Sequence, residues 1–323
     1  MKGDNFNGNA FANSAIDKGA YKVVIDEKDY LNENAILVPN VLNTLQELAT
    51  FHRDYLNIPI IALTGSNGKT TTKELINVVL SKKFNTIATL GNLNNHIGVP
   101  ITLLSMNKDT EIGIVEMGAN HHKEIELLCN IAKPDYGYIT NFGKAHLEGF
   151  GSLEGVIEAK TEMYQYLRKN NKIVFINAKD KNQIKHSNSI EKFTFGNESQ
   201  NCFTELISAS KELLLSYGTL SIQSRLIGKY NFNNISAAIA IGQYFKVDKN
   251  EIKQAIELYT PTNNRSQLIN KGTNKIVLDA YNANPSSMMA ALENFIQSKG
   301  VKKIVFLGDM FELGPDAEKE HQV

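Results

Sequence analysis

The feature that most constrains the fold of this chain is the segment at residues 60–74, which reads IIALTGSNGKTTTKE. The apolar run at 60–63 predicts a buried strand, and the two glycines after it predict a tight turn that leads into a helix. Such a turn directs several backbone N–H groups and a helix N-terminus at one point, which suits a phosphate group. The segment therefore predicts a nucleotide-binding loop at the end of a parallel strand.

The residue types in this loop match phosphate and metal binding. The Lys69 ammonium is expected near the outer phosphates, and the Thr70 hydroxyl would help to hold Mg²⁺. The spacing is Gly-x-x-Gly-Lys-Thr, because Leu63 occupies the place of the first glycine in the common P-loop. That departure points away from ordinary kinases and GTPases; a glycine-rich turn with a surface lysine is the simpler alternative. The residues expected to contact nucleotide are Gly65, Ser66, Asn67, Gly68, Lys69, Thr70 and Thr71.

The composition limits the partners and the compartment. Lys plus Arg and Asp plus Glu number 34 each, so no broad charged surface for nucleic acid or an anionic membrane is expected. No apolar run approaches the roughly 20 residues of a membrane span, and the N-terminus lacks the apolar core of a signal peptide. Cys129 and Cys202 are expected to be buried thiols in a reducing cytosol rather than a disulfide or a zinc site. These features predict a soluble cytoplasmic protein.

A chain of 323 residues exceeds what one hydrophobic core usually serves, so two or three domains are expected. Residues 1–58 predict a small α/β unit, and residues 59–262 alternate strands and helices, as in a parallel sheet covered on both faces. A linker-like stretch precedes a third α/β unit at 263–323, with too few elements to close a sheet. Strands are predicted at 60–63, 86–88, 112–115, 136–139, 172–176, 275–278 and 303–307, and the longer helices at 41–55, 153–168, 233–245, 249–259 and 286–297.

Several polar side chains follow these elements, at the sheet edge where ligands of parallel α/β proteins bind. Glu116 stands at a strand end, where its carboxylate could hold Mg²⁺; alone, it would be a charged loop residue. His146 follows the strand at 136–139, and by itself it would be a surface histidine. Lys160 lies in the middle of an expected helix, where an isolated lysine is usually solvated.

Two loops offer further hydrogen-bonding groups. The loop at 90–100 contains Asn94 and Asn95, and it is either a polar turn or part of a substrate site. The stretch at 279–286 follows a strand and opens a helix through Asn284-Pro285, which is unremarkable as a turn. As a site, its carboxylate, two amides and aromatic ring suit a ribose and a base.

In this order, the motifs resemble those of the Mur ligase family, nearly end to end. The resemblance implies an α/β enzyme of three domains: a UDP-substrate domain, a central P-loop parallel-sheet ATPase domain and a C-terminal Rossmann-like domain. It rests on residues 64–73, 91–100, 116–119 and 139–141, on His146, on the Glu158-Ala159-Lys160-x-Glu162 helix, on Asn231-x-x-Asn234, on Arg265 and on residues 279–285.

The resemblance is to the branch that adds D-alanyl-D-alanine to UDP-N-acetylmuramoyl-tripeptide in peptidoglycan synthesis. It implies that ATP, with Mg²⁺, converts the tripeptide carboxylate to an acyl phosphate, which the dipeptide amine attacks to form the amide bond. The enzyme would act as a monomer, with neither nucleic acid nor membrane as a partner. The alternatives are a sister Mur or folylpolyglutamate-type ligase that adds one amino acid, a nucleotide-binding fragment without turnover, and a P-loop kinase or GTPase. Residues 279–285 replace the Ala-His-containing turn of the single-residue ligases, which favours the dipeptide ligase.

The resemblance also implies individual roles. Lys69 would hold the β- and γ-phosphates, and Thr70 with Glu116 would bind Mg²⁺. His146 would help to place a second Mg²⁺. Lys160 matches the family lysine that carries a carbamate made from CO₂, which would ligate or orient that second metal. Further nucleotide contacts would come from Asn231, Asn234, Arg265, Asp279 and Asn282, and substrate contacts from Asn94, Asn95 and Asn284.

The chain departs from the family pattern in a few places. Tyr230 stands where histidine is usual before Asn231, and Thr161 stands where glycine is common after the carbamylated lysine. The matches at 2–6 and 306–314 lie close to the two ends, whereas the first and third domains of the family normally extend beyond them. We therefore expect a chain cut at both ends, with partial first and third domains.

Overall fold

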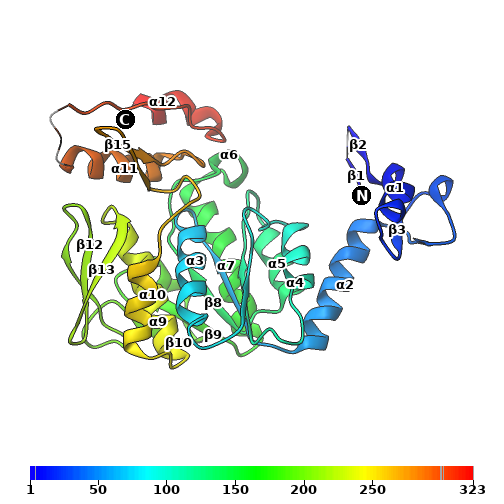
Figure 1. The fold of residues 1–323 in the computed structure, drawn as a ribbon, viewed down its shortest axis with the longest axis horizontal. Helices are drawn as coiled ribbons and strands as arrows, with labels where there is room; N and C mark the ends of the chain where they lie inside the picture. The colour runs from blue at the N-terminus through cyan, green and yellow to red at the C-terminus, as the bar shows by residue number, and fades with distance from the viewer. Residues whose placement is uncertain (4, 299, 301, 323) are drawn as a thin grey trace.

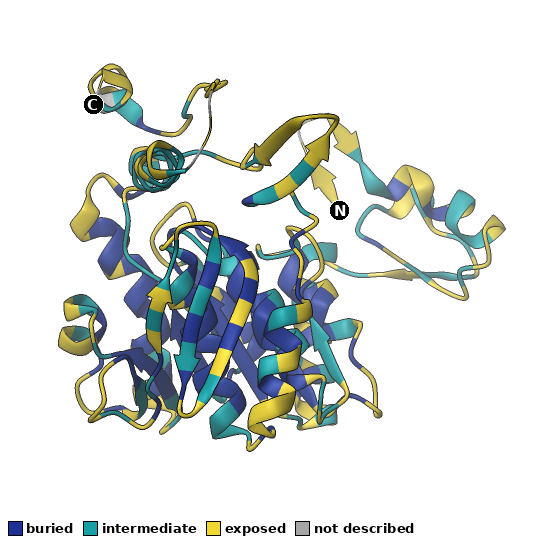
Figure 2. Cartoon of the chain, turned by 60° about the vertical axis from the view of Figure 1, so that its left-hand side comes forward, coloured by how far each residue is buried: buried dark blue, intermediate teal, exposed yellow. Residues whose placement is uncertain are grey.

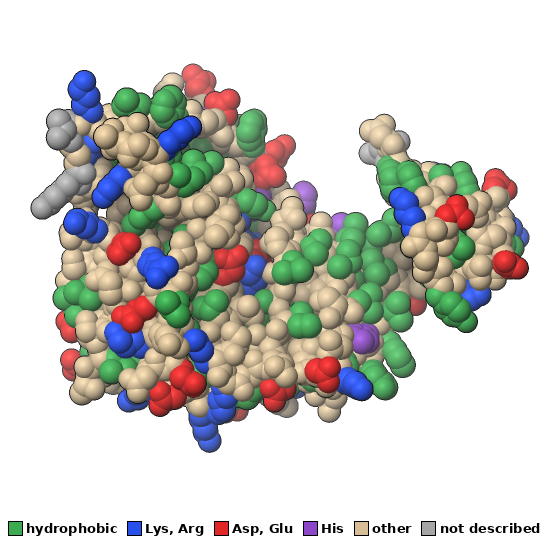
Figure 3. All heavy atoms as spheres, viewed as in Figure 1, with side chains coloured by type: hydrophobic (Ala, Val, Ile, Leu, Met, Phe, Trp, Pro, Cys, Tyr) green, Lys and Arg blue, Asp and Glu red, His purple; other side chains and the backbone are tan. Residues whose placement is uncertain are grey.

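The structure, a computed structural model, describes residues 1–3, 5–298, 300 and 302–322. Figure 1 shows a central unit with the C-terminal segments above it and an N-terminal unit set apart on the right. The long helix α2 (Val41–Leu56) leads from the N-terminal unit into the central one. The space-filling view in Figure 3 shows the same arrangement, with a hollow between the N-terminal unit and the rest of the chain.

The central unit is built on a parallel sheet of six strands, which confirms the predicted α/β class. All five residues of β5 (Ile60–Thr64) are buried, and the strand pairs with β7 on one side and β8 on the other. A strand covered on both faces must be apolar throughout, which explains the unbroken apolar run. The order across the sheet is β10 (Glu191–Phe195), β9 (Ile173–Asn177), β8 (Tyr136–Ile139), β5, β7 (Ile112–Glu116) and β6 (Thr86–Ala88).

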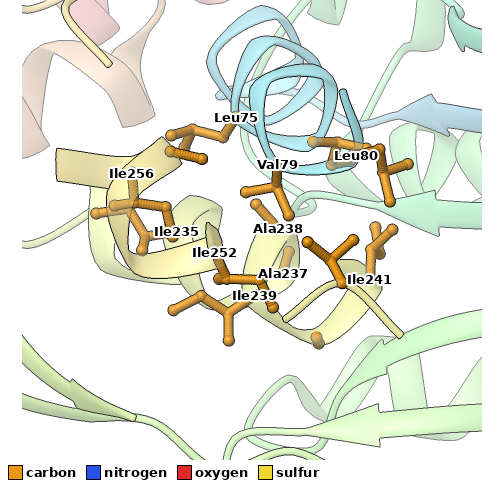
Figure 4. Packing of buried hydrophobic residues seen from close by; sticks show 14 of the residues in the cluster. Leu75, Val79, Leu80, Ile235, Ala237, Ala238, Ile239, Ile241, Ile252 and Ile256 are labelled. Atoms are coloured by element: carbon orange, nitrogen blue, oxygen red, sulfur yellow. The ribbon is translucent and has the colours of Figure 1, made fainter. Parts of the chain in front are cut away.

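One face of the sheet is covered by α3 (Lys69–Leu80), α9 (Asn231–Tyr244) and α10 (Lys249–Leu258). Figure 4 shows Val79 of α3 packed towards Ala238 of α9 and Ile252 of α10. The approach of α9 to α3 is close: a Cβ on Gly242 would lie 2.5 Å from Val79 Cγ1. Burial of such aliphatic side chains contributes roughly 1.5–3 kcal/mol each. This packing holds α3, and thereby the loop before it, against the sheet.

The other face of the sheet is covered by helices from the middle of the chain, with side chains of α2 joining their core. A three-stranded antiparallel sheet, β11–β12–β13, packs on the α9 side, and its apolar residues belong to the α3–α9 core. The helices of this part of the chain are α4 (Gly98–Leu104), α5 (Glu124–Ala132), α6 (Leu147–Phe150), α7 (Leu153–Lys169) and α8 (Lys181–His186). The strands of the small sheet are β11 (Glu205–Ser208), β12 (Glu212–Tyr217) and β13 (Leu220–Ile227).

The N-terminal unit is small and is anchored through α2. Arg53 near the end of α2 is buried, donating to the Asp135 carboxylate at 2.8 Å and to the Ala132 carbonyl at 3.1 Å. A buried guanidinium needs such partners, so this contact fixes α2 to the central unit. The unit contains β1 (Lys2–Gly3), β2 (Phe6–Asn7), η1 (Gly8–Phe11), α1 (Ala12–Asp17), η2 (Lys28–Tyr30) and the parallel pair β3 (Val23–Ile25) and β4 (Ala35–Leu37).

The C-terminal unit departs from the expectation. The predicted strand at 275–278 forms as β15 (Asn274–Leu278), but it pairs antiparallel with β14 (Gln267–Lys271). The predicted strand at 303–307 is wrong: its residues 303–307 pair with no strand in the described part of the chain, and Ile304 and Phe306 are 72% and 94% exposed. The remaining elements are α11 (Pro285–Gln297), η3 (Gly314–Asp316) and α12 (Ala317–Gln322).

Burial follows the same division. Figure 2 shows the buried residues concentrated in the central unit, whereas the two outer units are mostly intermediate or exposed. Cys129 and Cys202 are free, buried thiols, as predicted. Within the described ranges, no helix combines the length and the apolar character needed to cross a membrane.

Candidate functional site

The predicted phosphate loop follows β5 and has the backbone geometry that its glycines predict. Gly65 has φ +141°, and a Cβ there would lie 2.0 Å from Thr140 Oγ1. Gly68 has φ +78° and is the residue before α3, whose N-terminus points its free N–H groups at the loop. Glycine is required at both positions because an L side chain would be strained at these φ values.

A second loop, after β8, holds the phosphate loop in place. The Thr140 hydroxyl donates to the Asn67 carbonyl at 2.6 Å, and the Asn141 side chain both donates to that carbonyl and accepts from the Asn67 N–H. The Ser66 hydroxyl donates to the Gly143 carbonyl at 2.8 Å. The loop shape is therefore set by contacts within the protein before a ligand arrives.

Lys69 is the residue predicted to hold the β- and γ-phosphates. Its ammonium donates to the Gly65 carbonyl at 2.8 Å. Burial lowers the pKa of Lys69, and Arg265 acts in the same direction, whereas the Glu116 carboxylate opposes them. A partly buried cation held mainly by backbone carbonyls is poorly neutralised, so an incoming phosphate group would stabilise it.

Glu116, the last residue of β7, lies beside the phosphate loop. Its Oε1 accepts from Asn94 Nδ2 at 2.8 Å and from the Thr70 hydroxyl at 3.3 Å. Its Oε2 is buried and has no hydrogen-bond partner among the described residues. An unpaired buried carboxylate oxygen next to a hydroxyl fits a hard divalent cation such as Mg²⁺.

The described residues contain no cluster of three His, Cys, Asp or Glu side chains able to hold a metal. The protein therefore offers a metal two candidate ligands in this place, Thr70 and Glu116. That arrangement suits Mg²⁺, which keeps several waters and is commonly bound through one or two carboxylates and substrate phosphates.

His146 and Lys160 lie close enough to Lys69 for their charges to interact. His146 precedes α6 with φ +52°, and its Nδ1 is hydrogen-bonded to the Glu312 carboxylate. Burial lowers the pKa of His146, helped by the Lys69 and Lys160 ammonium groups, while Glu312 opposes them.

Lys160 is only 1% exposed, so a solvated helix lysine is the wrong interpretation. Its ammonium donates to the Ala119 carbonyl at 3.1 Å and lies 5.1 Å from the centre of the Phe150 ring. Burial, followed by the nearby Lys69 charge, lowers the pKa of Lys160 to about 7; Glu124 and Glu162 act in the opposite direction. A substantial fraction of the amine is therefore neutral near pH 7, and the neutral amine is the form that can react with CO₂.

The C-terminal unit supplies the opposite wall. Asn284 and Asn67 exchange side-chain hydrogen bonds, at 2.7 and 3.3 Å. The Arg265 guanidinium stacks on the Tyr281 ring at 3.8 Å, and its Nε is buried without a partner among the described residues. Burial raises the pKa of Asp279, although Arg265 and a Ser266 N–H oppose that shift.

These residues enclose one cavity of about 900 Å³, large enough for a nucleotide and part of a second substrate. Among the predicted site residues, Gly65 and Lys160 do not line it: Gly65 is buried against Thr140, and Lys160 lies behind Ala119, which does line it. The predicted residues on its wall are Ser66, Asn67, Gly68, Lys69, Thr70, Thr71, Asn94, Asn95, Glu116, His146, Asn231, Asn234, Arg265, Asp279, Asn282 and Asn284.

Several of these asparagines are already engaged with the protein. Asn94 holds Glu116, and the Asn95 side chain accepts the Gly98 N–H at 2.9 Å at the start of α4. Asn234 accepts from the Thr72 hydroxyl and donates to Asn231, which donates in turn to the Ile227 carbonyl. Their contacts position the walls of the cavity, and any ligand contact would use their remaining capacity.

Sequence reasoning missed three contributors to this wall. Tyr230, noted only as a departure from the family pattern, bonds to the Ser266 hydroxyl at 2.7 Å and links α9 to the C-terminal unit. Ser286 accepts the Lys144 N–H at 3.0 Å. Glu312 contacts His146. Each acts across a contact between units, and sequence spacing carries no signal for such contacts.

Comparisons with known proteins agree with this architecture. A family model described as the Mur ligase middle domain matches residues 63–242, and one described as the Mur ligase, glutamate ligase domain matches residues 264–323. The UDP-N-acetylmuramoyl-tripeptide–D-alanyl-D-alanine ligase of Bacillus subtilis is 36% identical over 100% of this chain and 72% of its own length. The enzyme of the same name from Escherichia coli is 32% identical over 99% of this chain and 73% of its own length.

Solved structures lead to the same group. MurF from Acinetobacter baumannii superposes with a TM-score of 0.87 at 31% identity, covering 99% of this chain and 72% of the other. MurF ligase from Thermotoga maritima in complex with ADP also gives a TM-score of 0.87, at 28% identity over 100% of this chain and 76% of the other.

Proposed function

The chain belongs to the Mur ligase family, and from that premise we propose that it joins D-alanyl-D-alanine to UDP-N-acetylmuramoyl-tripeptide in peptidoglycan synthesis. We further propose that the enzyme cleaves ATP to ADP and phosphate. We also propose that it is located in the cytoplasm and acts as a monomer. The observation that carries the proposal is the single cavity on which the phosphate loop, Glu116 and the C-terminal residues Arg265 and Asn284 converge. The ADP named for the Thermotoga maritima relative supports the nucleotide part.

The chemistry begins from an unreactive carboxylate, which is a poor acyl donor until its oxygen is made a leaving group. We infer that Lys69 binds the β- and γ-phosphates and that the loop N–H groups orient them for transfer to the tripeptide carboxylate. The acyl phosphate so formed is attacked by the dipeptide amine, and phosphate leaves. Arg265, stacked on Tyr281 and with a buried, unpaired Nε among the described residues, would bind a phosphate from the C-terminal side.

Thr70 and Glu116 would hold Mg²⁺, which when bound neutralises charge on the phosphate oxygens. His146 and a carbamate on Lys160 would hold or orient a second one. The fit is supported by the unpaired Glu116 Oε2 and by the depressed pKa of the buried Lys160 amine. Asp279, Asn282, Asn231 and Asn234 would face the nucleotide, and Asn94, Asn95 and Asn284 would face the muramyl peptide or the dipeptide. The three-domain division at residues 58 and 262 stays a prediction.

The test is phosphate release from ATP and Mg²⁺ with UDP-N-acetylmuramoyl-tripeptide, comparing D-alanyl-D-alanine with single amino acids. We expect release to require the dipeptide. Release with a single amino acid instead would assign the chain to a sister ligase. No acceptor-dependent release would leave a nucleotide-binding protein without ligase turnover.

Lys69→Ala is the matched variant for the nucleotide part. It removes a charge-assisted contact worth about 1.5–3 kcal/mol, so nucleotide binding should weaken roughly 10- to 150-fold, with loss of phosphate release. Circular dichroism should show an intact fold, because Lys69 contacts only the backbone of its own loop. Normal turnover by this variant would refute the nucleotide assignment.

A further inference from the structure

Glu312 brings the C-terminal unit into contact with the cavity at a second place. Its carboxylate bonds to His146 Nδ1, and its backbone carbonyl accepts the Glu148 N–H at 3.1 Å. The next residue, Leu313, is 3% exposed, although the preceding stretch is largely exposed. Glu312 also lines the cavity. The segment is thus docked beside α6 through one side-chain and one backbone hydrogen bond, and Leu313 is buried next to them.

Both partners of this contact have an unusual backbone. His146 has φ +52° and Glu312 has φ +60°, in the left-handed region that only a few per cent of residues other than glycine adopt. Such conformations persist only where the surroundings hold them, and they gather at functional sites. Here the backbone hydrogen bond from Glu148 to Glu312 keeps the Glu312 side chain facing that of His146.

The chemistry of the contact selects a tautomer. A neutral imidazole carries a hydrogen on one nitrogen only, and a carboxylate can only accept. The hydrogen must therefore lie on Nδ1, which leaves Nε2 as the acceptor. A histidine oriented in this way by a carboxylate is a better ligand or proton acceptor, because both the ring plane and the free nitrogen are fixed.

We propose that Glu312 is a positioning residue, which fixes His146 as the Nδ1–H tautomer and so makes Nε2 available for the reaction. The inference rests on the proposed function, since it takes His146 to work in that reaction. It assigns the C-terminal unit a role beyond covering the nucleotide: contact between the two units sets the histidine.

The test reads the tautomer directly in the ligand-free chain. Histidine labelled with ¹⁵N in the ring is incorporated, and His146→Gln assigns the signal among the seven histidines. Glu312→Gln keeps the length of the side chain, but its amide can donate as well as accept. Glu312→Asp keeps a group that only accepts. Glu320→Gln is the matched control, because Glu320 comes from the same unit and pairs with Lys144, two residues before His146.

We expect the hydrogen on Nδ1 in the unmodified chain, in Glu312→Asp and in Glu320→Gln, and a mixture or the Nε2–H form in Glu312→Gln. In the ligase assay, Glu312→Gln should lower kcat about 10- to 100-fold with little change in KM for ATP, as for residues that orient a ligand. Glu320→Gln should stay within about fivefold, as for an ion pair whose lysine is exposed to solvent.

An unchanged tautomer in Glu312→Gln would overturn the proposal. A fall in kcat with an unchanged tautomer would overturn it too, because Glu312 would then only dock the segment. If the tautomer responds while the unmodified chain shows no ligase turnover, the positioning role stands and the proposed function fails. The two conclusions are therefore separable.

Discussion

Replacing Lys160 by methionine should remove a pH-dependent part of the stability of the fold. The Lys160 ammonium is buried in α7 against the Ala119 carbonyl and the Phe150 ring. Burial and the Lys69 charge lower its pKa from the ordinary 10.5 to about 7. Methionine has a similar length and no charge, so it fills the same space without the titration.

The sign follows from the protons bound by each state. Below about pH 7 the amine is protonated in the folded and the unfolded chain, so the cost of burying the charge is complete and constant. Between about pH 7 and 10.5 mainly the unfolded chain binds the proton, so the free energy of unfolding rises with pH. At 1.36 kcal/mol per unit, the rise due to Lys160 between pH 7 and 9 is about 2 kcal/mol.

Urea unfolding at several pH values from 6 to 9, in buffer free of CO₂, measures this contribution. The pKa of Lys69 is also lowered, so the difference between the unmodified chain and Lys160→Met isolates Lys160 better than the slope of either one. Between pH 7 and 9, the free energy of unfolding of the unmodified chain should rise by about 2 kcal/mol relative to that of Lys160→Met. Lys169→Met, an exposed site at the end of the same helix, should leave the profile parallel to that of the unmodified chain. A difference between the chain and Lys160→Met that is constant with pH would refute the reasoning.

Two further predictions concern the site. Lys160→Ala should lose ligase turnover and regain part of it when a small carboxylic acid is added in place of the carbamate; phosphate release measures this, and full activity without the acid would remove Lys160 from the site. Asn284→Ser keeps a good cap for α11 but is too short to reach Asn67. A double-mutant cycle with Asn67→Ala, read by calorimetric binding of ADP and Mg²⁺, should therefore give a coupling of about 0.5–3 kcal/mol, and purely additive effects would contradict the contact.

Sequence patterns predict the central sheet well and the C-terminal unit poorly, for one physical reason. β5 and β8 coincide with the predicted strands because a strand buried on both faces must be apolar along its length. Residues 304–307 of the predicted strand at 303–307 are equally apolar, but a strand exists only where neighbouring backbone groups accept its hydrogen bonds. Among the described residues nothing pairs with it. The sequence pattern predicts a loop at 90–100, whereas α4 begins at Gly98. Pro100 lies in its first turn, where proline is tolerated because its missing N–H is not needed.

For the site, the sequence locates the residues at the strand ends but not their partners. The phosphate loop and Glu116 are found because topology brings the carboxyl ends of β5 and β7 to one edge. Asn94 was predicted to meet substrate, yet its amide holds Glu116, which spacing alone does not reveal. The partner of His146 lies 166 residues further along the chain, so Glu312 has no local signal.

The charged groups around the cavity are incompletely neutralised by the protein. Burial lowers the pKa of both Lys69 and Lys160. The Lys69 charge lowers the pKa of Lys160 further, and the Arg265 charge lowers that of Lys69. Glu116 Oε2, meanwhile, is buried without a partner among the described residues. Lysines without a nearby anion and a carboxylate without a nearby cation both destabilise the fold, and a bound group of opposite charge removes that penalty. A nucleotide carrying Mg²⁺ supplies both at once, and a carbamate would turn Lys160 from an opponent of Lys69 into its counter-ion. Under the proposed function, binding of such a nucleotide would relieve these unpaired charges, and that relief would contribute to its affinity.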